Sequence, residues 1–265
     1  MKNNQRIISI LKTPSLDLYV TGFKSFNLSE LELLGNLDFE LPANLRLGHL
    51  AEKVVSKLIK TSTNYNVLYE NIQLIEEGKT IGEIDFIISE KETKQIIHLE
   101  LAYKFYLFDP NYSSLEINNW IGPNRNDSLT QKLEKIKTKQ FPLLHHKAAQ
   151  EKFKDINIKE ASQKLCLLVS LYIPYTYKAE FTPVFQKAIK GYYVNAEKFT
   201  DFDHSEKKYC LPSKKKWGID PSHNEDWMSF KEIEQEMNSS ISEKQSRLCW
   251  EKHNNSYSQL FIVWW

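Results

Sequence analysis

Three consecutive β-rich runs between residues 66 and 108 constrain the fold of this chain most. They read NVLYENIQLIEE, TIGEIDFIISE and QIIHLELAYKFYLF, and the polar turn EKETK joins the last two. Runs of this length that are rich in Ile, Leu, Val, Phe and Tyr and end at turn residues are typical of strands. Because the connections are short, the sequence predicts an antiparallel β-meander.

Helices are predicted on both sides of this meander. Apolar residues recur at helical spacing over about 46–61, namely Leu47, Leu50, Ala51, Val54, Val55 and Leu58. A second helix, SLTQKLEKIKTKQFPLL, follows the turn segment IGPNRND, and its buried side is expected to hold Leu129, Leu133 and Ile136. The continuously apolar run KLCLLVSLYIPY predicts a buried strand. The predicted fold class is therefore α/β (α+β), with the order helix, three strands, helix, strand over about 44–178.

The remainder of the chain, about 179–265, is expected to form a C-terminal extension packed on this core within a single domain, 1–265. Its segments predict a strand (GYYVNAEKF), a loop (KKYCLPSKKKWGIDP), a helix (EDWMSFKEIEQEM) and a closing strand (SQLFIVWW). No low-complexity linker separates this part from the core, which favours one domain over two.

Composition narrows the classes of function. The formal net charge is +1, so any binding site for a polyanion has to come from a local basic face. The three cysteines are far apart in the sequence, which argues against a disulfide framework and against a zinc site. No run reaches the ~18 apolar residues of a membrane span. We expect a cytoplasmic protein without membrane association, and the sequence leaves its oligomeric state open.

Polar residues on the second and third predicted strands form the candidate site. His98, Glu100 and Lys104 share one face of an extended strand. With a turn at 90–94, facing residues sum to about 184, which places Asp85 beside Glu100. Two adjacent carboxylates repel unless a cation lies between them, so the pair predicts a site for Mg²⁺ or Mn²⁺. The alternatives are a solvent-facing Asp85 and a helical salt bridge between Glu100 and Lys104.

Other residues have an ordinary reading beside a functional one. His98 could touch substrate or metal, or be a satisfied histidine of the sheet. Lys132, Lys135 and Lys139 form a basic stripe on the second helix that could meet a phosphate backbone or simply be solvated, and Gln140 could contact substrate. The loop 214–216 beside Trp217 could stack on bases or serve solubility alone.

The same residues resemble known families. The order helix, meander, helix, strand, with Gly-x-x-Asp on the second strand and Glu plus Lys on the third, resembles the restriction-endonuclease-like core of PD-(D/E)XK nucleases. The phrases HLELAYKFYL, IGPNRNDSLTQKLEKI and KKWGIDP resemble more closely a bacterial family described as domain of unknown function 1853. This resemblance covers about Leu47 to Pro221.

The nuclease resemblance implies a role for each candidate. Asp85 and Glu100 would hold the metal, Lys104 would orient or help activate the attacking water, and Glu52 would be the acid on the first helix. One feature departs from the pattern, because Ala102 occupies the usual lysine position of Glu-x-Lys. Lys104 lies one pleat further along, about 6.6 Å at the usual strand rise.

The function expected from this resemblance is Mg²⁺-dependent or Mn²⁺-dependent hydrolysis of phosphodiester bonds in DNA, less readily in RNA. One alternative is a catalytically inactive nuclease-fold module that binds nucleic acid or protein. Another is a hydrolase of a small phosphorylated metabolite, which predicts an enclosed pocket and no basic face.

Overall fold

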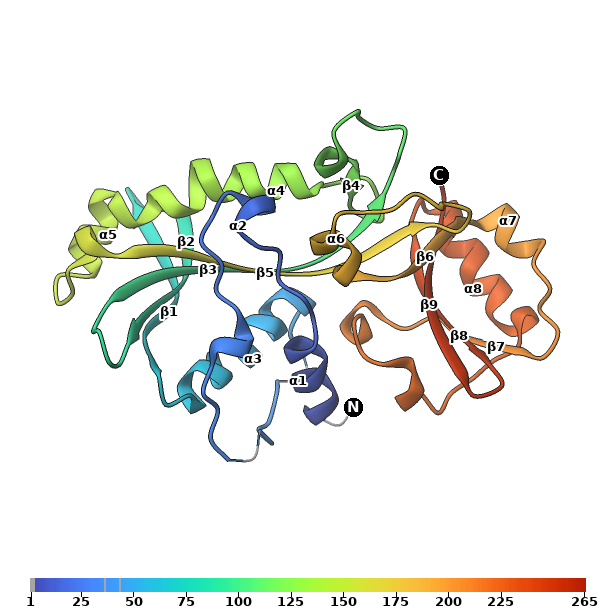
Figure 1. Ribbon diagram of the computed structural model, residues 1–265, viewed down its shortest axis with the longest axis horizontal. Helices are drawn as coiled ribbons and strands as arrows, with labels where there is room; N and C mark the ends of the chain where they lie inside the picture. Colours follow the sequence, from blue (N-terminus) through green and yellow to red (C-terminus); the bar gives the residue numbers. More distant parts are fainter. Residues whose placement is uncertain (1–2, 36, 43) are drawn as a thin grey trace. The chain divides into compact units, whose positions relative to one another are not determined.

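The computed structural model describes residues 3–35, 37–42 and 44–265, and the chain forms two compact units. Unit 1 comprises Met1–Tyr103 and Gln131–Leu168, and unit 2 comprises Lys104–Thr130 and Val169–Trp265. The long strands β3 (Ile96–Phe108) and β5 (Ser162–Pro174) each begin in unit 1 and end in unit 2 (Figure 1). The boundary between the units therefore runs inside two strands. The single domain with an extension from about 179 stays a prediction.

Unit 1 contains the predicted helix and meander. In chain order its elements are α1 (Asn3–Leu11), α2 (Leu18–Thr21), the 3₁₀ turn η1 (Leu28–Glu30), α3 (Leu47–Thr61), β1 (Tyr65–Glu76), β2 (Lys79–Glu90), the start of β3, the helical run from Gln131, α5 (Lys147–Lys152), the 3₁₀ turn η5 (Ile158–Glu160) and the start of β5. Its strands lie in the order β1-β2-β3-β5. Both hairpins of the meander are antiparallel, which confirms the prediction.

Helices cover both faces of the sheet of unit 1. α3 and α1 lie on one face, and the helical run that ends in α5 lies on the other (Figure 1). The predicted apolar stripe of α3 is buried throughout, and Lys60 of this helix pairs with Glu70 of β1 at 2.8 Å. On the opposite face Leu144, Ala149 and Phe153 pack against the sheet in one apolar cluster. Both faces of the meander are therefore covered in unit 1.

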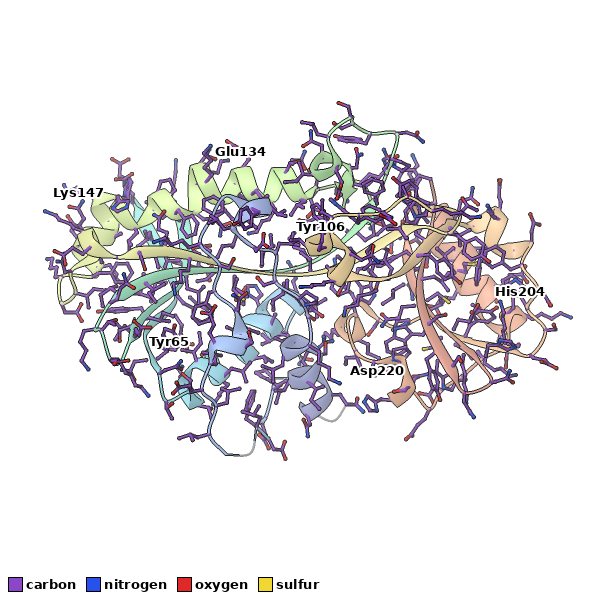
Figure 2. The ribbon with its side chains drawn as sticks, viewed as in Figure 1. Tyr65, Tyr106, Glu134, Lys147, His204 and Asp220 are labelled. Carbon is purple, nitrogen blue, oxygen red and sulfur yellow. The ribbon has the colours of Figure 1, made fainter. Side chains whose placement is uncertain are left out.

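The predicted second helix changes its pitch midway. It consists of α4 (Leu129–Lys135), the π-helical segment η3 (Ile136–Gln140) and the 3₁₀ segment η4 (Phe141–His145). Leu129, Leu133 and Ile136 are buried as predicted, whereas Glu134 lies on the outer side of the run (Figure 2). No local sequence pattern predicts the π turn, because its i→i+5 bonds depend on how the run packs.

The π turn alters which side chains share a side of the run. Lys132 and Gln140 are eight residues apart, which in a regular α-helix puts them about 80° apart around the axis. A π turn contains one additional residue, so eight steps become equivalent to about seven α-helical steps and end within about 20° of two full turns. The two side chains meet accordingly, with Lys132 Nζ 2.8 Å from Gln140 Oε1.

The strands β2 and β3 are paired only beyond the end of the GEID segment, which is Asp85. Their ladder runs from Ser89↔Ile96 to Phe86↔Leu99 and ends there, whereas the β1–β2 ladder continues to Glu76↔Lys79. The first half of β2 therefore follows β1 and leaves β3. We call the point of separation the fork, and Asp85 is its first residue on β2.

Unit 2 is built around a second stretch of sheet. Its elements are the end of β3, the 3₁₀ turn η2 (Glu116–Asn119), β4 (Trp120–Ile121), the start of α4, the end of β5, α6 (Pro183–Ala188), β6 (Ile189–Asn195), α7 (Ala196–Thr200), β7 (Lys207–Cys210), the 3₁₀ turns η6 (Lys214–Lys216) and η7 (Pro221–His223), α8 (Phe230–Ser242), β8 (Arg247–His253) and β9 (Ser256–Val263). The strand order is β5-β6-β9-β8-β7, and β4 pairs with β3.

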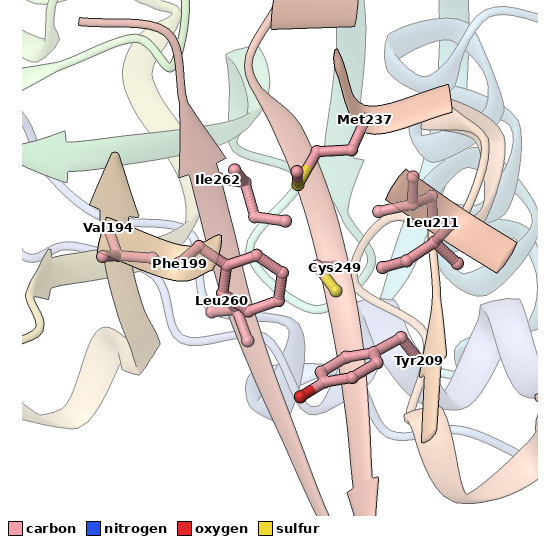
Figure 3. Close-up of a cluster of buried hydrophobic side chains, with 9 residues drawn as sticks. Val194, Phe199, Tyr209, Leu211, Met237, Cys249, Leu260 and Ile262 are labelled. Atoms are coloured by element: carbon pink, nitrogen blue, oxygen red, sulfur yellow. The ribbon is translucent and has the colours of Figure 1, made fainter. Parts of the chain in front are cut away.

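The core of unit 2 lies between this sheet and α7 and α8. Figure 3 shows Phe199, Tyr209, Met237, Cys249 and Leu260 packed together there.

All three cysteines of the chain, Cys166, Cys210 and Cys249, are free and buried. Within the part of the chain that the structure describes, no helix is long and apolar enough to cross a membrane.

The predictions for unit 2 are confirmed in part. The strand β9 lies where predicted, and β6 accounts for the first part of the predicted strand 191–199, whose remainder is in the helix α7. The segment 207–221 is not all loop because it contains β7, and β8 was not predicted. The predicted helix 225–237 begins later, at Phe230, because Ser229 and Glu232 form a capping box that fixes its first turn.

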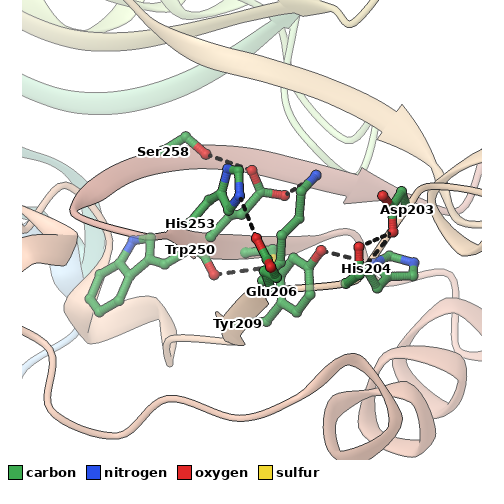
Figure 4. A network of polar contacts seen from close by, with 11 residues as sticks. Asp203, His204, Glu206, Tyr209, Trp250, His253 and Ser258 are labelled. Atoms are coloured by element: carbon green, nitrogen blue, oxygen red, sulfur yellow. Dashed lines mark hydrogen bonds and ion pairs between the residues drawn. The ribbon is translucent and has the colours of Figure 1, made fainter.

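Trp217 and the polar side chains of the β7–β8–β9 region make their contacts within unit 2. Trp217 is only 9% exposed and packs edge-on against Phe105 and Phe261, so the base-stacking role considered for it is wrong. The polar groups of the β7–β8–β9 region also bond to one another (Figure 4): His204 Nδ1 lies 2.8 Å from the Tyr209 hydroxyl, and Lys207 pairs with Glu251 at 3.4 Å.

Candidate functional site at the fork of unit 1

The fork brings the two predicted carboxyl groups together. The half-buried Asp85 accepts a hydrogen bond at Oδ2 from the backbone N–H of Leu101, 2.8 Å away. This bond occupies a donor of β3 just beyond the last pair of the β2–β3 ladder. The register of that ladder, continued by one residue, sets Asp85 opposite Glu100, whose side chain is fully buried. The numbers of two facing residues add up to 185 in this ladder, one more than the sequence-based value of about 184.

A chain of hydrogen bonds orients Glu100. Its Oε1 lies 2.9 Å from His98 Nε2, and its Oε2 accepts from Gln140 Nε2. Lys132 Nζ donates to the other end of the same amide, Gln140 Oε1. Because the ammonium has to meet the amide oxygen, the amide nitrogen faces Glu100. The order Lys132, Gln140, Glu100, His98 is therefore a continuous polar network.

Burial makes both carboxyl groups weak acids. It raises the pKa of Asp85 to about 8, the nearby charge of Glu100 raises it further, and the Leu101 N–H opposes the shift. Burial likewise raises the pKa of Glu100 to about 7, against the opposing charge of Lys132. Since the carboxyl groups are coupled, the pair retains a proton at neutral pH when no cation is bound.

His98 is a neutral partner of Glu100. Burial lowers the pKa of its ring to about 4, and the ring is fully buried with its edge against Phe141, the centroids 5.2 Å apart. Its Nδ1 has no hydrogen-bond partner among the described residues. A neutral ring that donates from Nε2 to an ionised Glu100 leaves only a lone pair unbonded, which costs less than an unbonded N–H.

Two further acids lie near the pair. Glu52 of α3 is 17% exposed and contacts His49 Nδ1 at 3.0 Å, which raises the pKa of that histidine. The charge of Glu52 raises the pKa of Asp85, and the charge of Glu83 raises that of Glu100. The site thus has four acidic side chains near one lysine, Lys132, which is hydrogen-bonded to the Gln140 amide.

These residues suit a hard divalent cation in the kind of donor they offer. Among the described residues no group of three or more His, Cys, Asp and Glu side chains is arranged to hold a metal ion. Asp85 and Glu100 supply two carboxyl groups, one fewer than such a group would need. Mg²⁺ is commonly bound by one or two carboxylates while water and substrate phosphate fill its other positions.

Comparison with known proteins gives one family match, which covers nearly the whole chain. The family described as "Domain of unknown function (DUF1853)" matches residues 25–262. The chain belongs to this family. Searches of curated proteins and of solved structures gave no match. The matched region extends on both sides beyond residues 47–221, the part of the chain over which the sequence resembled this family, and it includes residues of both units.

In this member of DUF1853 the predicted lysines differ in their contacts. Lys104 belongs to unit 2, where its ammonium pairs with Asp127 at 2.7 Å. Lys135 and Lys139 are exposed, whereas Lys132 is half-buried and bonded to Gln140, and the role of the three lysines as a phosphate-binding stripe stays a prediction.

Sequence reasoning missed Asn71 of β1, which adopts a positive φ of 54°. A signal was present, because Asn is depleted in strands and is one of the few residues that adopt a left-handed backbone readily. The sequence offered no signal that Lys132 bonds to Glu100 through Gln140, since that link depends on the π turn.

Proposed function

We propose that unit 1 carries a metal-dependent phosphodiesterase site that acts on nucleic acid, with DNA as the expected substrate and RNA as the less favoured one. The observation that supports this most is the fork, where Asp85 and Glu100 face each other and Glu100 is held by His98 and by Gln140. Buried acids with raised pKa values cluster at functional sites, because stability alone does not favour them. The resemblance to PD-(D/E)XK nucleases points to the same chemistry.

Asp85 and Glu100 are the residues that would hold Mg²⁺ or Mn²⁺. When bound, such an ion supplies charge stabilisation at a scissile phosphate and lowers the pKa of the attacking water. The protein supplies the orientation: His98 and Gln140 fix the two oxygens of Glu100, and the Leu101 N–H fixes Asp85. This leaves little reorganisation for the moment of reaction.

Lys132 is the lysine that we assign to this site. Its ammonium is bonded to Gln140 and its charge acts on both carboxyl groups. A cation there can position a phosphate and offset the negative charge that develops on it. The role predicted for Lys104 stays a prediction, and its salt bridge with Asp127 is the observation against it. The exposed Lys135 and Lys139 could contact the phosphates of a longer strand.

The test is cleavage of plasmid DNA, single-stranded DNA and RNA with Mg²⁺ or Mn²⁺, and with the chelator EDTA. We expect metal-dependent cleavage that is lost in Asp85→Asn and Glu100→Gln, both of which keep the shape of the side chain. Glu134→Gln, on the outer side of the helical run, is the matched control and should cleave normally.

Other outcomes would redirect the proposal. Salt-sensitive DNA binding without cleavage under any of these conditions would favour an inactive binding module. Hydrolysis of small phosphate esters without cleavage of polynucleotides would favour a metabolite hydrolase. Cleavage that survives in both carboxamide variants would remove the fork from the reaction.

A further inference from the structure

Asn71 lies across from Asp85 in the β1–β2 hairpin. The ladder pairs Glu70 with Phe86 and Ile72 with Ile84, so the register position of Asn71 faces that of Asp85. Asn71 has a φ of 54°, a left-handed conformation inside a strand. A left-handed backbone costs most non-glycine residues about 1 kcal/mol or more, and the cost is smallest for asparagine and aspartate. Strain of this kind is common at functional sites.

The strand alternation breaks at this pair on both strands. Residues three apart in a regular strand point to opposite faces. Yet Tyr69 and Ile72 of β1 both pack in one apolar cluster, and so do Ile84 and Ile87 of β2. The hairpin therefore turns about its own axis at Asn71 and Asp85, which is where β2 leaves β3.

The backbone alone does not account for an asparagine here. Glycine adopts a positive φ without strain and would allow the same turn. What asparagine adds is an amide, and its Oδ1 is buried without a hydrogen-bond partner among the described residues. An unsatisfied buried acceptor costs about 1–3 kcal/mol. This cost falls on the residue that faces Asp85, which is explained if the oxygen has a ligand to bind.

We propose that Asn71 Oδ1 is a third protein oxygen for the divalent cation held by Asp85 and Glu100. This inference rests on the metal site of the proposed function and adds a residue to it. An amide carbonyl is a hard ligand of the kind Mg²⁺ and Mn²⁺ accept. It is neutral, so it adds a ligand without adding charge to a site where two carboxyl groups already repel each other.

Asn71→Gly tests the inference, because it keeps the left-handed backbone and removes the oxygen. Calorimetric titration with Mn²⁺ should show affinity at least about 10-fold weaker than wild type, a loss of the size seen when residues that support a metal are removed. Asn71→Asp retains an oxygen and tolerates the backbone, so it should bind at least as tightly as wild type. Asn254→Gly is the matched control, since Asn254 has the same φ of 54° in the exposed turn between β8 and β9.

Thermal unfolding without metal separates a ligand from a structural role. Removing strain and an unpaired oxygen should leave Asn71→Gly no less stable than wild type. Wild-type Mn²⁺ affinity in Asn71→Gly would overturn the inference. If Asp85→Asn loses binding while Asn71→Gly retains it, only the role of Asn71 fails. If the wild-type protein binds no Mn²⁺, the metal site of the proposed function fails and this inference with it.

Discussion

Several half-buried acids of unit 2 are paired with cations, whereas the two acids at the fork of unit 1 face each other. In unit 2 Asp127 pairs with Lys104 at 2.7 Å, Asp109 with Arg125 at 3.0 Å, and Glu251 with Lys207 at 3.4 Å. In unit 1 Asp85 and Glu100 face each other, and the Glu100 carboxylate bonds to His98 and Gln140. Partly exposed ion pairs contribute about 0–1 kcal/mol, whereas two buried like charges oppose folding. In the proposed function a bound cation would compensate for the second arrangement.

The backbone of the β1–β2 hairpin in unit 1 is also less regular than that of the β8–β9 hairpin in unit 2. The β8–β9 hairpin of unit 2 keeps one register from Arg247↔Ile262 to His253↔Ser256. The β1–β2 hairpin of unit 1 has two register shifts and the left-handed Asn71, and the helical run beside it contains the π segment η3. Irregular backbone gathers around the fork. Unit 1 therefore has irregular backbone beside the two facing acids, an arrangement that is common at functional sites.

The largest expected effect separates the two lysines. Lys132→Met should lower the rate of DNA cleavage by about 10²–10³-fold, the usual cost of removing one donor that stabilises transition-state charge. Lys104→Met should change the rate little, because that ammonium is committed to Asp127. Both changes keep the aliphatic stem and remove only the charge. Steady-state cleavage rates with Mn²⁺, beside metal affinities, make the comparison.

The opposite result would be equally informative. An inactive Lys104→Met together with an active Lys132→Met would restore the sequence-based assignment and break the contrast between the units. Asp127→Asn then serves as a control, since it removes the partner of Lys104 but not the lysine. Each variant should bind Mn²⁺ nearly as well as wild type, because neither lysine offers an oxygen ligand.

The pH dependence of stability gives a second, smaller contrast. Folding raises the pKa of Asp85 to about 8 and that of Glu100 to about 7, so between about pH 4 and 8 the folded state holds more protons than the unfolded state. The free energy of unfolding then falls as pH rises, by up to about 1.4 kcal/mol per pH unit for each additional proton held. His98, whose pKa is lowered to about 4, opposes this trend below pH 6.5. The net fall should be clearest from pH 6.5 to 8.

Urea unfolding with EDTA at a series of pH values measures this slope. The double variant Asp85→Asn, Glu100→Gln should flatten it, because neither carboxamide titrates. Saturating Mn²⁺ should raise the stability of wild type at pH 8 by binding the ionised pair. The same urea series on Asp109→Asn, Asp127→Asn should keep the wild-type slope, and equal flattening there would contradict the contrast drawn between the units.

The helix α3 and the meander of unit 1 could be predicted from the sequence because the patterns that indicate them are local. The apolar stripe of α3 and the three strand runs each follow a period that a window of about ten residues reveals. The facing of Asp85 and Glu100 followed from one short turn, which fixes the register of a hairpin to within about a residue. These predictions needed no knowledge of distant contacts.

The rest depended on contacts that no local pattern records. The link from Lys132 to Glu100 requires the π turn, and the pairing of Lys104 with Asp127 spans 23 residues across a turn. β8 was missed because RLCWEKH has only three apolar residues in a row before its polar end. Its pairing with β9 supplies what its own sequence lacks.

The smallest expected effect concerns the exposed lysines of the helical run in unit 1. If Lys135 and Lys139 contact phosphates, replacing both with Gln should lower the slope of log affinity against log salt by up to about 2 units, because each lost contact releases about one counterion fewer. Affinity should fall alike for unrelated DNA sequences, since phosphate contacts carry no sequence information. Fluorescence anisotropy between 50 and 200 mM salt, in the Asp85→Asn background so that the DNA stays intact, gives the slope. The exposed Lys187 and Lys198 of unit 2, replaced together by Gln, are a control of equal charge. An equal change of slope for both pairs would mean that DNA responds to the overall charge of the protein, and no change for Lys135 and Lys139 would confine recognition to the fork itself.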